Sequence, residues 1–222
     1  IQNFRNFEHI VIDGGSTDGT LKFIKNNTAI DIWVSEKDKG IYDAINKGLE
    51  LSKGKYVNTI NAGDYYYSSK SLSIINEYFK KKNLSFVFGS VMKKKIYYKY
   101  QPEKMIRTFN FYPAHSGGFF VKKSVHKKIG MYSLKFPCSS DYDFFWRLIK
   151  KNKYKGVSTK KNEIISVFKS GGFSSKYSVF QHIWEETLIR FHNDQNKIIV
   201  ITILVLRLIK NCYKIFIRKN KI

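Results

Sequence analysis

The sequence predicts an α/β fold with a mostly parallel central sheet and helices on both faces. Two observations carry this prediction. Short apolar runs of strand length alternate with segments of helical spacing through about residue 90, and this alternation is typical of parallel strands linked by helices. The first apolar run also ends in Asp13-Gly14-Gly15, and a glycine pair after an acidic residue marks a sharp turn out of the strand.

The first strand is predicted at residues 9–12, and helical spacing begins after Asp18. Ligands of open α/β sheets bind beyond the carboxyl ends of the strands. A carboxylate at Asp13 is therefore placed to accept hydrogen bonds from a base or a ribose. The alternative is that Asp13 only caps the helix that follows it.

The remaining elements follow in order along the chain. Strands are expected at residues 30–35, 55–60 and 84–89, and helices at residues 41–51 and 69–82. Residues 91–120 break the alternation, and their basic run MKKKIYYKYQ suggests an exposed strand or hairpin. Beyond this region we expect helices at residues 123–129, 141–151 and 177–192, a strand at 163–168 and a flexible loop at 170–175.

The C-terminal tail differs in composition from the rest. Residues 198–206 form an unbroken apolar run, which is too short to cross a bilayer that needs about 20 residues. The cations that follow recur every three to four residues, at Arg207, Lys210, Lys214 and Arg218. Residues 197–219 therefore fit a helix that lies on an anionic membrane surface. The alternative is a helix that docks on the domain or on a second copy.

Length, charge and cysteine content limit the possible functions but do not select one. The chain has 222 residues and a formal net charge of +23, which suits one sizeable domain with an anionic partner. That partner could be a nucleotide phosphate, an anionic lipid or a nucleic acid. The two cysteines, Cys138 and Cys212, are far apart, so neither a zinc site nor a disulfide framework is indicated. A reducing, cytoplasmic setting fits best.

Three acidic residues follow predicted strands: Asp13, Asp38 and Asp64. Because the carboxyl ends of parallel strands converge, we expect these side chains around one crevice. A nucleoside would use some of them, and a divalent cation that bridges a diphosphate would use another. The alternative for Asp64 is a turn residue after Gly63.

Five motifs now carry a resemblance to a known family. In order they are VIDGGSTDGT, SEKDKGIYDAINKG, INAGD, HSGGFFV and SSDYDFFWRL. Together they resemble family 2 glycosyltransferases of the GT-A fold, in particular bacterial enzymes of surface-polysaccharide assembly. The resemblance covers about residues 5–190. It implies a GT-A nucleotide-diphospho-sugar transferase domain over residues 1–193 that lacks its usual first strand, and a basic amphipathic helical tail over residues 194–222.

The resemblance also implies roles for single residues. Asp13, with Gly14 beside it, would contact the nucleotide base, and Asp38 and the helix with Asn46 would flank the nucleoside. Asp64 would be the last acid of the metal-binding motif, and Asp141 the catalytic base. Asp143 would point elsewhere. His115 would contact the donor diphosphate or the metal, or else make a structural hydrogen bond.

Two departures from the family pattern affect the diphosphate site. Many members have two or three acids where this chain has only Asp64. Many members also have an arginine where Ile45 stands. The positive charge beside the diphosphate would then come from a Mg²⁺ or Mn²⁺ ion, from Lys122 or from Lys123.

The implied function is inverting transfer of a sugar from a nucleotide-sugar donor to a hydroxyl group of a saccharide or lipid-linked saccharide. Such a transfer would serve lipopolysaccharide or capsule assembly at the inner face of the cell membrane. The C-terminal helix could also form a homo-oligomer. Two alternatives are a nucleic-acid-binding protein and a nucleotidyltransferase. The lysines are dispersed and no nucleic-acid-binding module is recognisable, and the DYDFFWRL motif favours sugar transfer.

Overall fold

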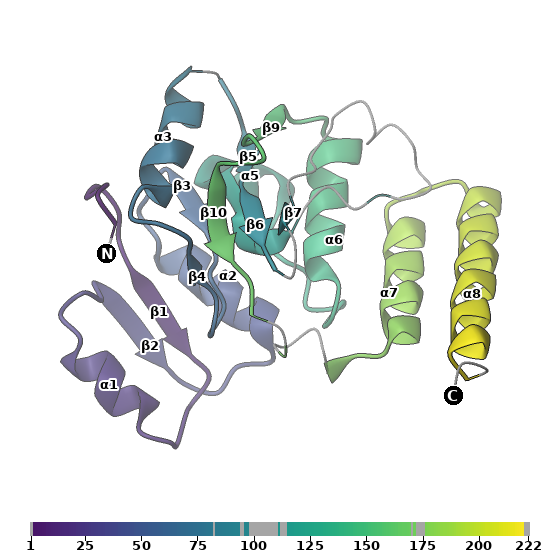
Figure 1. Cartoon of the computed structure of the whole chain (residues 1–222), viewed down its shortest axis with the longest axis horizontal. Helices are drawn as coiled ribbons and strands as arrows, with labels where there is room; N and C mark the ends of the chain where they lie inside the picture. Colours follow the sequence, from purple (N-terminus) through teal and green to yellow (C-terminus); the bar gives the residue numbers. More distant parts are fainter. Residues whose placement is uncertain are drawn as a thin grey trace.

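The computed structural model describes residues 2–81, 83–93, 96–97, 111, 115–169, 171 and 176–219. It confirms the α/β class: strands occupy the centre, helices cover them, and α6, α7 and α8 stand side by side on one flank (Figure 1). The tip of the predicted loop at 170–175 and most of the basic run after residue 93 lie outside the described residues.

Most elements fall where the sequence places them. The strands are β1 (Ile10–Asp13), β2 (Ile32–Ser35), β3 (Tyr56–Asn58), β4 (Tyr65–Tyr66), β5 (Phe86–Phe88), β6 (Ser90–Met92), β7 (Ile96–Tyr97), β8 (Phe119–Lys122), β9 (Gly156–Ser158) and β10 (Ile164–Val167). The α-helices are α1 (Thr20–Asn26), α2 (Ile41–Leu51), α3 (Ser71–Lys81), α5 (Lys123–Ile129), α6 (Ser140–Phe145), α7 (Val179–His192) and α8 (Lys197–Lys219). A short 3₁₀ turn, η2 (Ser116–Gly118), precedes β8, and α6 continues into a π-helical segment, η3 (Trp146–Lys151).

The sheets are mixed, which corrects the expectation of a mostly parallel sheet. Their orders are β1-β2, β3-β8-β5-β9 and β4-β10-β6-β7. The pairs β1–β2, β5–β9 and β6–β10 are parallel, whereas β8 runs antiparallel to both β3 and β5. The reason is that parallel pairs require a crossover between the strands, and the strand–helix alternation that predicts such crossovers stops at about residue 90, before β8.

Two glycines join the sheets that contain β5 and β6. The chain passes from β5 to β6 at Gly89, whose N–H donates to the carbonyl oxygen of Gly118 over 2.7 Å. A Cβ atom on Gly118 would overlap the carbonyl oxygen of Gly89 and would also lie 2.8 Å from Cγ2 of Val91. Only glycine at residue 118 therefore lets the turn before β8 lie this close to the β5–β6 strand.

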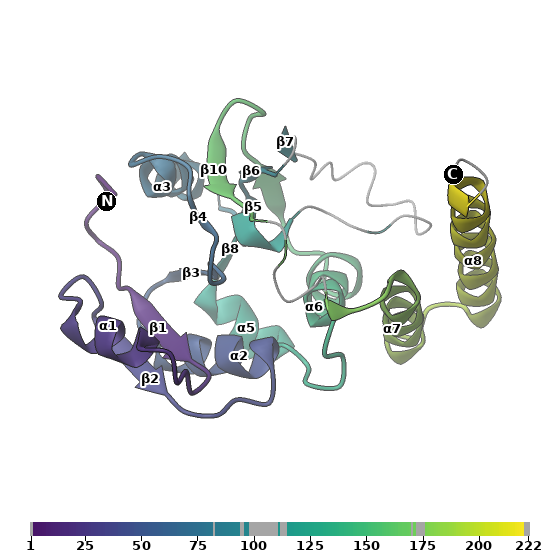
Figure 2. The ribbon, with the colours of Figure 1, turned by 60° about the horizontal axis from the view of Figure 1, so that its bottom comes forward.

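The core is two-sided, with the period of two expected of strands. Phe86 and Phe88 of β5 face one side, and Val87 between them faces the other. The first side packs against α5 and α6 through Val125, Phe144 and Phe145, and the second packs against α3 through Ile75 and Phe79. Helices thus cover both faces of this sheet, as Figure 2 also shows. This packing fixes the start of α6 relative to β8.

The outer face of α8 differs from the sequence-based expectation. Ile198, Ile201, Val205 and Ile209 are between 47% and 75% exposed, whereas Val200 and Ile203 are buried. Arg207 points toward α7, where it forms an ion pair with Glu186. The basic stripe was expected to meet the membrane, but at Arg207 it faces the protein, and the exposed face is apolar. The side chains of Lys214 and Arg218 lie outside the described residues. Within the described chain, no helix is both long and apolar enough to span a membrane.

Candidate active site

A cavity of about 510 Å³ lies between α2, the β3–β4 loop, the turn before β8, and helices α6 and α7. Three of the residues predicted from sequence line it: Asp64, His115 and Asp141. Asp13, Gly14, Asp38 and Asn46 are not among its lining residues. The predicted site is therefore divided into a cavity and a separate loop cluster.

Asp141 lies in the first turn of α6. Its Oδ1 accepts hydrogen bonds from the Tyr42 hydroxyl at 3.1 Å and from the Tyr142 backbone N–H at 2.8 Å. Burial raises the pKa of Asp141, and the negative charge of Glu186 adds to this effect. These contacts leave Oδ2 available on a carboxylate whose affinity for a proton is enhanced, which suits a general base.

Asp143 has a different role, as predicted. It is 1% exposed, and its Oδ2 accepts from Arg147 Nε at 2.8 Å. Its Oδ1 accepts from Asn193 Nδ2 at 2.9 Å. Both oxygens of Asp143 therefore hold α6 to its neighbours.

Asp64 lies in the loop between β3 and β4. Its Oδ1 accepts a hydrogen bond from the Lys169 backbone N–H at 2.9 Å. Burial raises the pKa of Asp64, while the positive charge of Lys93 lowers it. A partly buried carboxylate of this kind gains from a bound cation, because the cation favours its ionised form.

His115 lies beside the same loop and forms the N-terminal cap of η2. Its Nδ1 accepts from the Gly117 N–H at 3.2 Å, which leaves the ring proton on Nε2. Its ring packs on Phe168 with centroids 4.5 Å apart. Burial, with a smaller contribution from Lys93, lowers the pKa of His115 to about 4. His115 is thus a neutral hydrogen-bond donor near pH 7.

The residues present fit a divalent cation only in a limited way. Among the described residues, no group of three or more His, Cys, Asp or Glu is placed to hold a metal ion. Asp64 offers one carboxylate oxygen that no backbone group occupies. Mg²⁺ often takes only one or two carboxylates from the protein and its other ligands from phosphate and water. Asp64 therefore fits a cation that arrives with a diphosphate.

The loop cluster brings together Asp13, Gly14 and Asp38. Asp13 accepts four hydrogen bonds, from Gly15 N, Ser16 N, Ser16 Oγ and Ser35 Oγ, and the Ser16 and Ser35 hydroxyls are the main reason that the pKa of Asp13 is lowered. The Asp38 carboxylate packs over Gly14, where a Cβ atom would lie 2.5 Å from Asp38 Oδ2. Asp13 does not cap α1, whose N-cap is Gly19. A donor contact at these residues remains a prediction.

Asn46 ties α2 to the segment that leads into α6. Its Nδ2 donates to the Tyr132 carbonyl at 2.8 Å, and its Oδ1 accepts from the Tyr132 N–H at 3.0 Å. Both the nitrogen and the oxygen of the Asn46 amide are hydrogen-bonded to the backbone of Tyr132, which favours a structural role. Its predicted contact with the donor stays untested.

The two lysines proposed for the diphosphate lie elsewhere. Lys122 Nζ donates to Asn83 Oδ1 at 2.9 Å, and Lys123 Nζ donates to the Ser52 carbonyl. Neither lines the cavity. Lys169 does line it, and Lys93 lies close enough to affect both Asp64 and His115. Sequence reasoning missed these two because a basic run and an isolated lysine carry no spacing signal.

His126 is a second histidine of the cavity wall. It is 4% exposed, and its ring stacks on Phe144 with centroids 4.4 Å apart. Neither ring nitrogen has a hydrogen-bond partner among the described residues. Burial, with a contribution from Arg147, lowers the pKa of His126 to about 4. The ring is therefore neutral at pH 7.

Comparison with known proteins gives the family. The sequence profile described as Glycosyl transferase family 2 matches residues 2–137. A PGL/p-HBAD biosynthesis glycosyltransferase of Mycobacterium bovis is 27% identical over 152 residues, which cover 64% of this chain and 58% of that protein. An uncharacterized glycosyltransferase of Rickettsia typhi is 22% identical over 165 residues, which cover 67% of this chain and 51% of that protein. The chain thus spans little more than half the length of these relatives.

Solved structures confirm the GT-A fold. S. aureus TarS 1–349 in complex with UDP-GlcNAc has a TM-score of 0.64 at 15% identity, covering 93% of this chain and 64% of that one. The mannosyltransferase PcManGT from Pyrobaculum calidifontis, in complex with GDP-Man and Mn²⁺, has a TM-score of 0.61 at 15% identity. The match covers 88% of this chain and 58% of that one. At this identity the likeness concerns the fold.

Replacing His126 with Phe should make folding stability less sensitive to acid. The pKa of His126 is lower in the folded chain than the value of about 6.5 expected when unfolded, so the unfolded state binds more protons between about pH 6.5 and pH 4. Wild-type stability should therefore fall as the pH decreases through this window, and the decrease should be smaller in His126→Phe. Urea unfolding at a series of pH values measures it. His192→Asn, an exposed histidine of α7, is the control, and equal pH slopes in all three proteins would contradict the assignment.

Proposed function

The chain belongs to glycosyl transferase family 2, and from this premise we propose that it transfers a sugar from a nucleoside-diphosphate donor to a hydroxyl group of an acceptor, with inversion. The observation that carries the proposal is the shared cavity of Asp64 and Asp141, two carboxylates whose pKa values burial raises. The first suits a cation that accompanies a diphosphate, and the second suits removal of a proton. The named ligands of the structural neighbours, UDP-GlcNAc and GDP-Man, support a donor of this class.

The mechanism assigns one step to each group. Asp141 takes the proton of the acceptor hydroxyl while that oxygen attacks the anomeric carbon. The bond between that carbon and the diphosphate oxygen breaks on the opposite side, which inverts the configuration. Lys93 and Lys169 lie near Asp64, where their positive charge and the Nε2–H of His115 favour the departing diphosphate. Asp13 and Asp38 would receive the base and ribose at the neighbouring loops.

A Mg²⁺ or Mn²⁺ ion, when bound, would neutralise charge on the diphosphate as it leaves. Asp64 is the residue that would hold it, through its unoccupied carboxylate oxygen. Mn²⁺ is named in the complex of the archaeal structural neighbour. With a single protein carboxylate, binding of the cation should depend on the nucleotide.

The acceptor is proposed to be a saccharide carried on a lipid, in surface-polysaccharide assembly at the inner face of a bacterial membrane. The support is the apolar outer face of α8, defined by Ile198, Ile201, Val205 and Ile209. Lys210 is exposed beside this face. An exposed apolar stripe flanked by a cation on a chain of net charge +23 suits contact with an anionic membrane surface.

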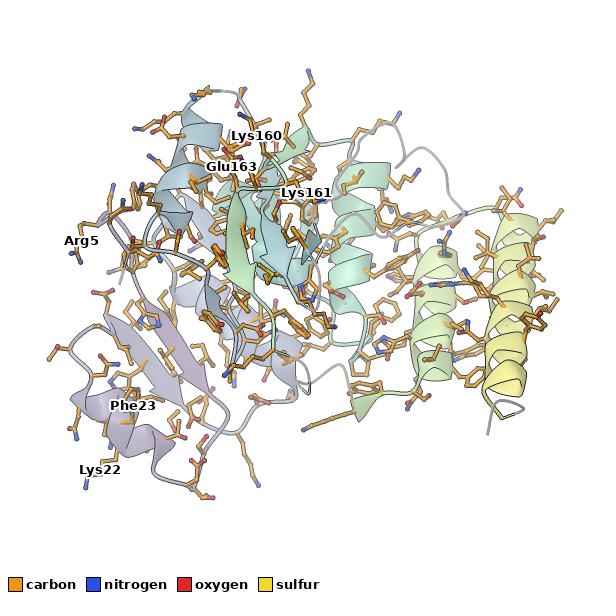
Figure 3. The ribbon with its side chains drawn as sticks, in the orientation of Figure 1. Arg5, Lys22, Phe23, Lys160, Lys161 and Glu163 are labelled. Carbon is orange, nitrogen blue, oxygen red and sulfur yellow. The ribbon has the colours of Figure 1, made fainter. Side chains whose placement is uncertain are left out.

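The positive charge gives little support to the nucleic-acid alternative. Figure 3 shows Lys22 on α1, Arg5 near the start of β1, and Lys160 and Lys161 near the start of β10. These cations are spread over separate parts of the molecule, whereas nucleic-acid binders gather theirs in a stripe. We therefore keep sugar transfer as the proposal.

Asp141→Asn should abolish the chemistry while preserving the fold. The amide oxygen can still accept from Tyr42 and Tyr142, but the side chain can no longer take a proton. We expect turnover of UDP-GlcNAc or GDP-mannose to fall about 10²–10⁴-fold, with the affinity for UDP or GDP unchanged by calorimetry. Asp143→Asn is the contrast, because losing the buried ion pair with Arg147 should lower thermal stability. Normal turnover in Asp141→Asn would refute the assignment of Asp141 as the general base.

Asp64→Asn should remove the effect of the cation on nucleotide binding. Calorimetry of UDP and GDP is run with MnCl₂ and again with EDTA. Wild type should bind the nucleotide more tightly with Mn²⁺, and in the variant the two conditions should give the same affinity. A Mn²⁺ effect of equal size in both proteins would show that another residue holds the metal.

Ile209→Glu should weaken membrane binding about tenfold or more, because burying an isoleucine side chain contributes about 1.5–3 kcal/mol. Flotation with phosphatidylglycerol vesicles, and with neutral phosphatidylcholine vesicles for comparison, measures it. Phe23→Glu is the matched control, since Phe23 is 69% exposed on α1, far from α8 (Figure 3). Flotation unaffected by Ile209→Glu would contradict the proposal. A solution dimer lost in that variant would assign the face to self-association instead.

A further inference from the structure

Helix α7 contributes two polar side chains to the cavity that no motif indicated, His182 and Glu186. They are four residues apart, so they share one face of the helix. Both lie beyond residue 137, where the match to the family profile ends. The part of the cavity wall that they form therefore lies outside the segment that the profile matches.

Glu186 is held from outside the cavity. Its side chain is 15% exposed, and its Oε2 accepts a hydrogen bond and an ion pair from Nη1 of Arg207 on α8. Among the described residues, Arg207 is the only hydrogen-bond partner of Glu186 that the structure gives. The second oxygen, Oε1, remains available to accept a hydrogen bond from a molecule in the cavity.

A half-buried carboxylate needs such a partner. Removing a carboxylate from water is costly unless an opposite charge is close. If one member of the ion pair were neutralised, the charge of the other would be left uncompensated. The ion pair with Arg207 therefore compensates the charge of Glu186 and limits its rotamers. Because Arg207 comes from α8, this ion pair connects the C-terminal helix to the cavity wall.

Glu186 also lies close enough to Asp141 for their charges to interact. The titratable groups that surround Asp141 come from α2, the segment before α6, and α7: they are Tyr42, Tyr132, Cys138, His182 and Glu186. Glu186 is the acid among them. Glu186 thus lines the same cavity as the base and lies within reach of its charge, where it can contact an acceptor whose hydroxyl group meets Asp141.

Resting on the proposed function, we propose that Glu186 binds a hydroxyl group of a polyhydroxylated acceptor beside Asp141, and that Arg207 is the positioning residue that holds Glu186 in place. Sugars suit this site because vicinal hydroxyl groups can donate to two neighbouring carboxylates at once. One hydroxyl donates to Glu186 Oε1 while the next presents its oxygen for attack and its proton to Asp141.

The first test separates acceptor binding from donor binding. Wild type, Glu186→Gln, Arg207→Gln and Lys22→Gln are assayed with UDP-GlcNAc and GDP-mannose against a panel of octyl glycosides. Lys22→Gln removes one positive charge at an exposed position of α1. Glu186→Gln and Arg207→Gln should raise the acceptor KM about tenfold and leave the donor KM unchanged, whereas Lys22→Gln should change neither. An unchanged acceptor KM, or an equal increase in the donor KM, would overturn the proposal.

The second test needs no substrate. In protein labelled with ¹³C at the aspartate carboxyl carbons, the pKa of Asp141 is read by NMR and assigned with Asp141→Asn. Glu186→Gln removes a neighbouring negative charge and should lower the pKa of Asp141 by about half a unit or more. Arg207→Gln leaves the charge of Glu186 without its partner and should raise the pKa of Asp141, and Lys22→Gln should leave that pKa unchanged. The same pKa in all four proteins would overturn the arrangement.

If Arg207→Gln does not fold, the double variant Glu186→Gln/Arg207→Gln is used in its place. It removes both charges of the ion pair together, so neither charge is left without a partner. It should behave like Glu186→Gln in both tests, and wild-type behaviour would refute the proposal. A wild-type protein that turns over neither donor would contradict the proposed function alone. The NMR titration would then still decide whether Arg207 and Glu186 act on Asp141.

Discussion

The close approach of Gly118 to Gly89 is the constraint on which the site depends. It allows one continuous segment, β5 to β6, to serve two sheets, and it holds the turn that carries His115 against both. Because β8 leaves that turn directly into the core, His115 and the β3–β4 loop with Asp64 are presented to the same cavity. The aromatic packing between β5, β8 and α6 then brings Asp141 to that cavity as well.

Three aspartates of the site show how the surroundings decide chemistry. Asp13 receives hydrogen bonds from its own loop and from Ser35, and its pKa is lowered. Asp64 and Asp141 receive fewer, and burial raises the pKa of each. The first is a stable acceptor that shapes the loop, and the other two gain from a cation or a proton. Because the side chains are identical, this division follows from their surroundings: hydrogen bonds dominate at Asp13, and burial dominates at Asp64 and Asp141.

Helix α8 combines two properties that its sequence does not connect. Its outer face is apolar and exposed, and its inner face carries Arg207 to Glu186. The same helix is thus available to a surface and connected to the cavity wall. Neither property requires the helix to cross a bilayer, and both depend on α7 lying between α8 and α6 (Figure 2).

The sequence alone determined the local elements and the family. Apolar runs, helical spacing and glycine turns predicted α2 and α5 at their observed bounds, and the ordered motifs identified glycosyl transferase family 2. Tertiary structure decided the rest. Residues distant in the chain set the antiparallel direction of β8 and bring the charge of Lys93 near Asp64. They also place Glu186 in the cavity wall, pair Asn46 with Tyr132 and turn Arg207 toward α7. Spacing along a chain reports neighbours within a helix or strand, but charge pairing and burial across elements exist only once the sheets have packed.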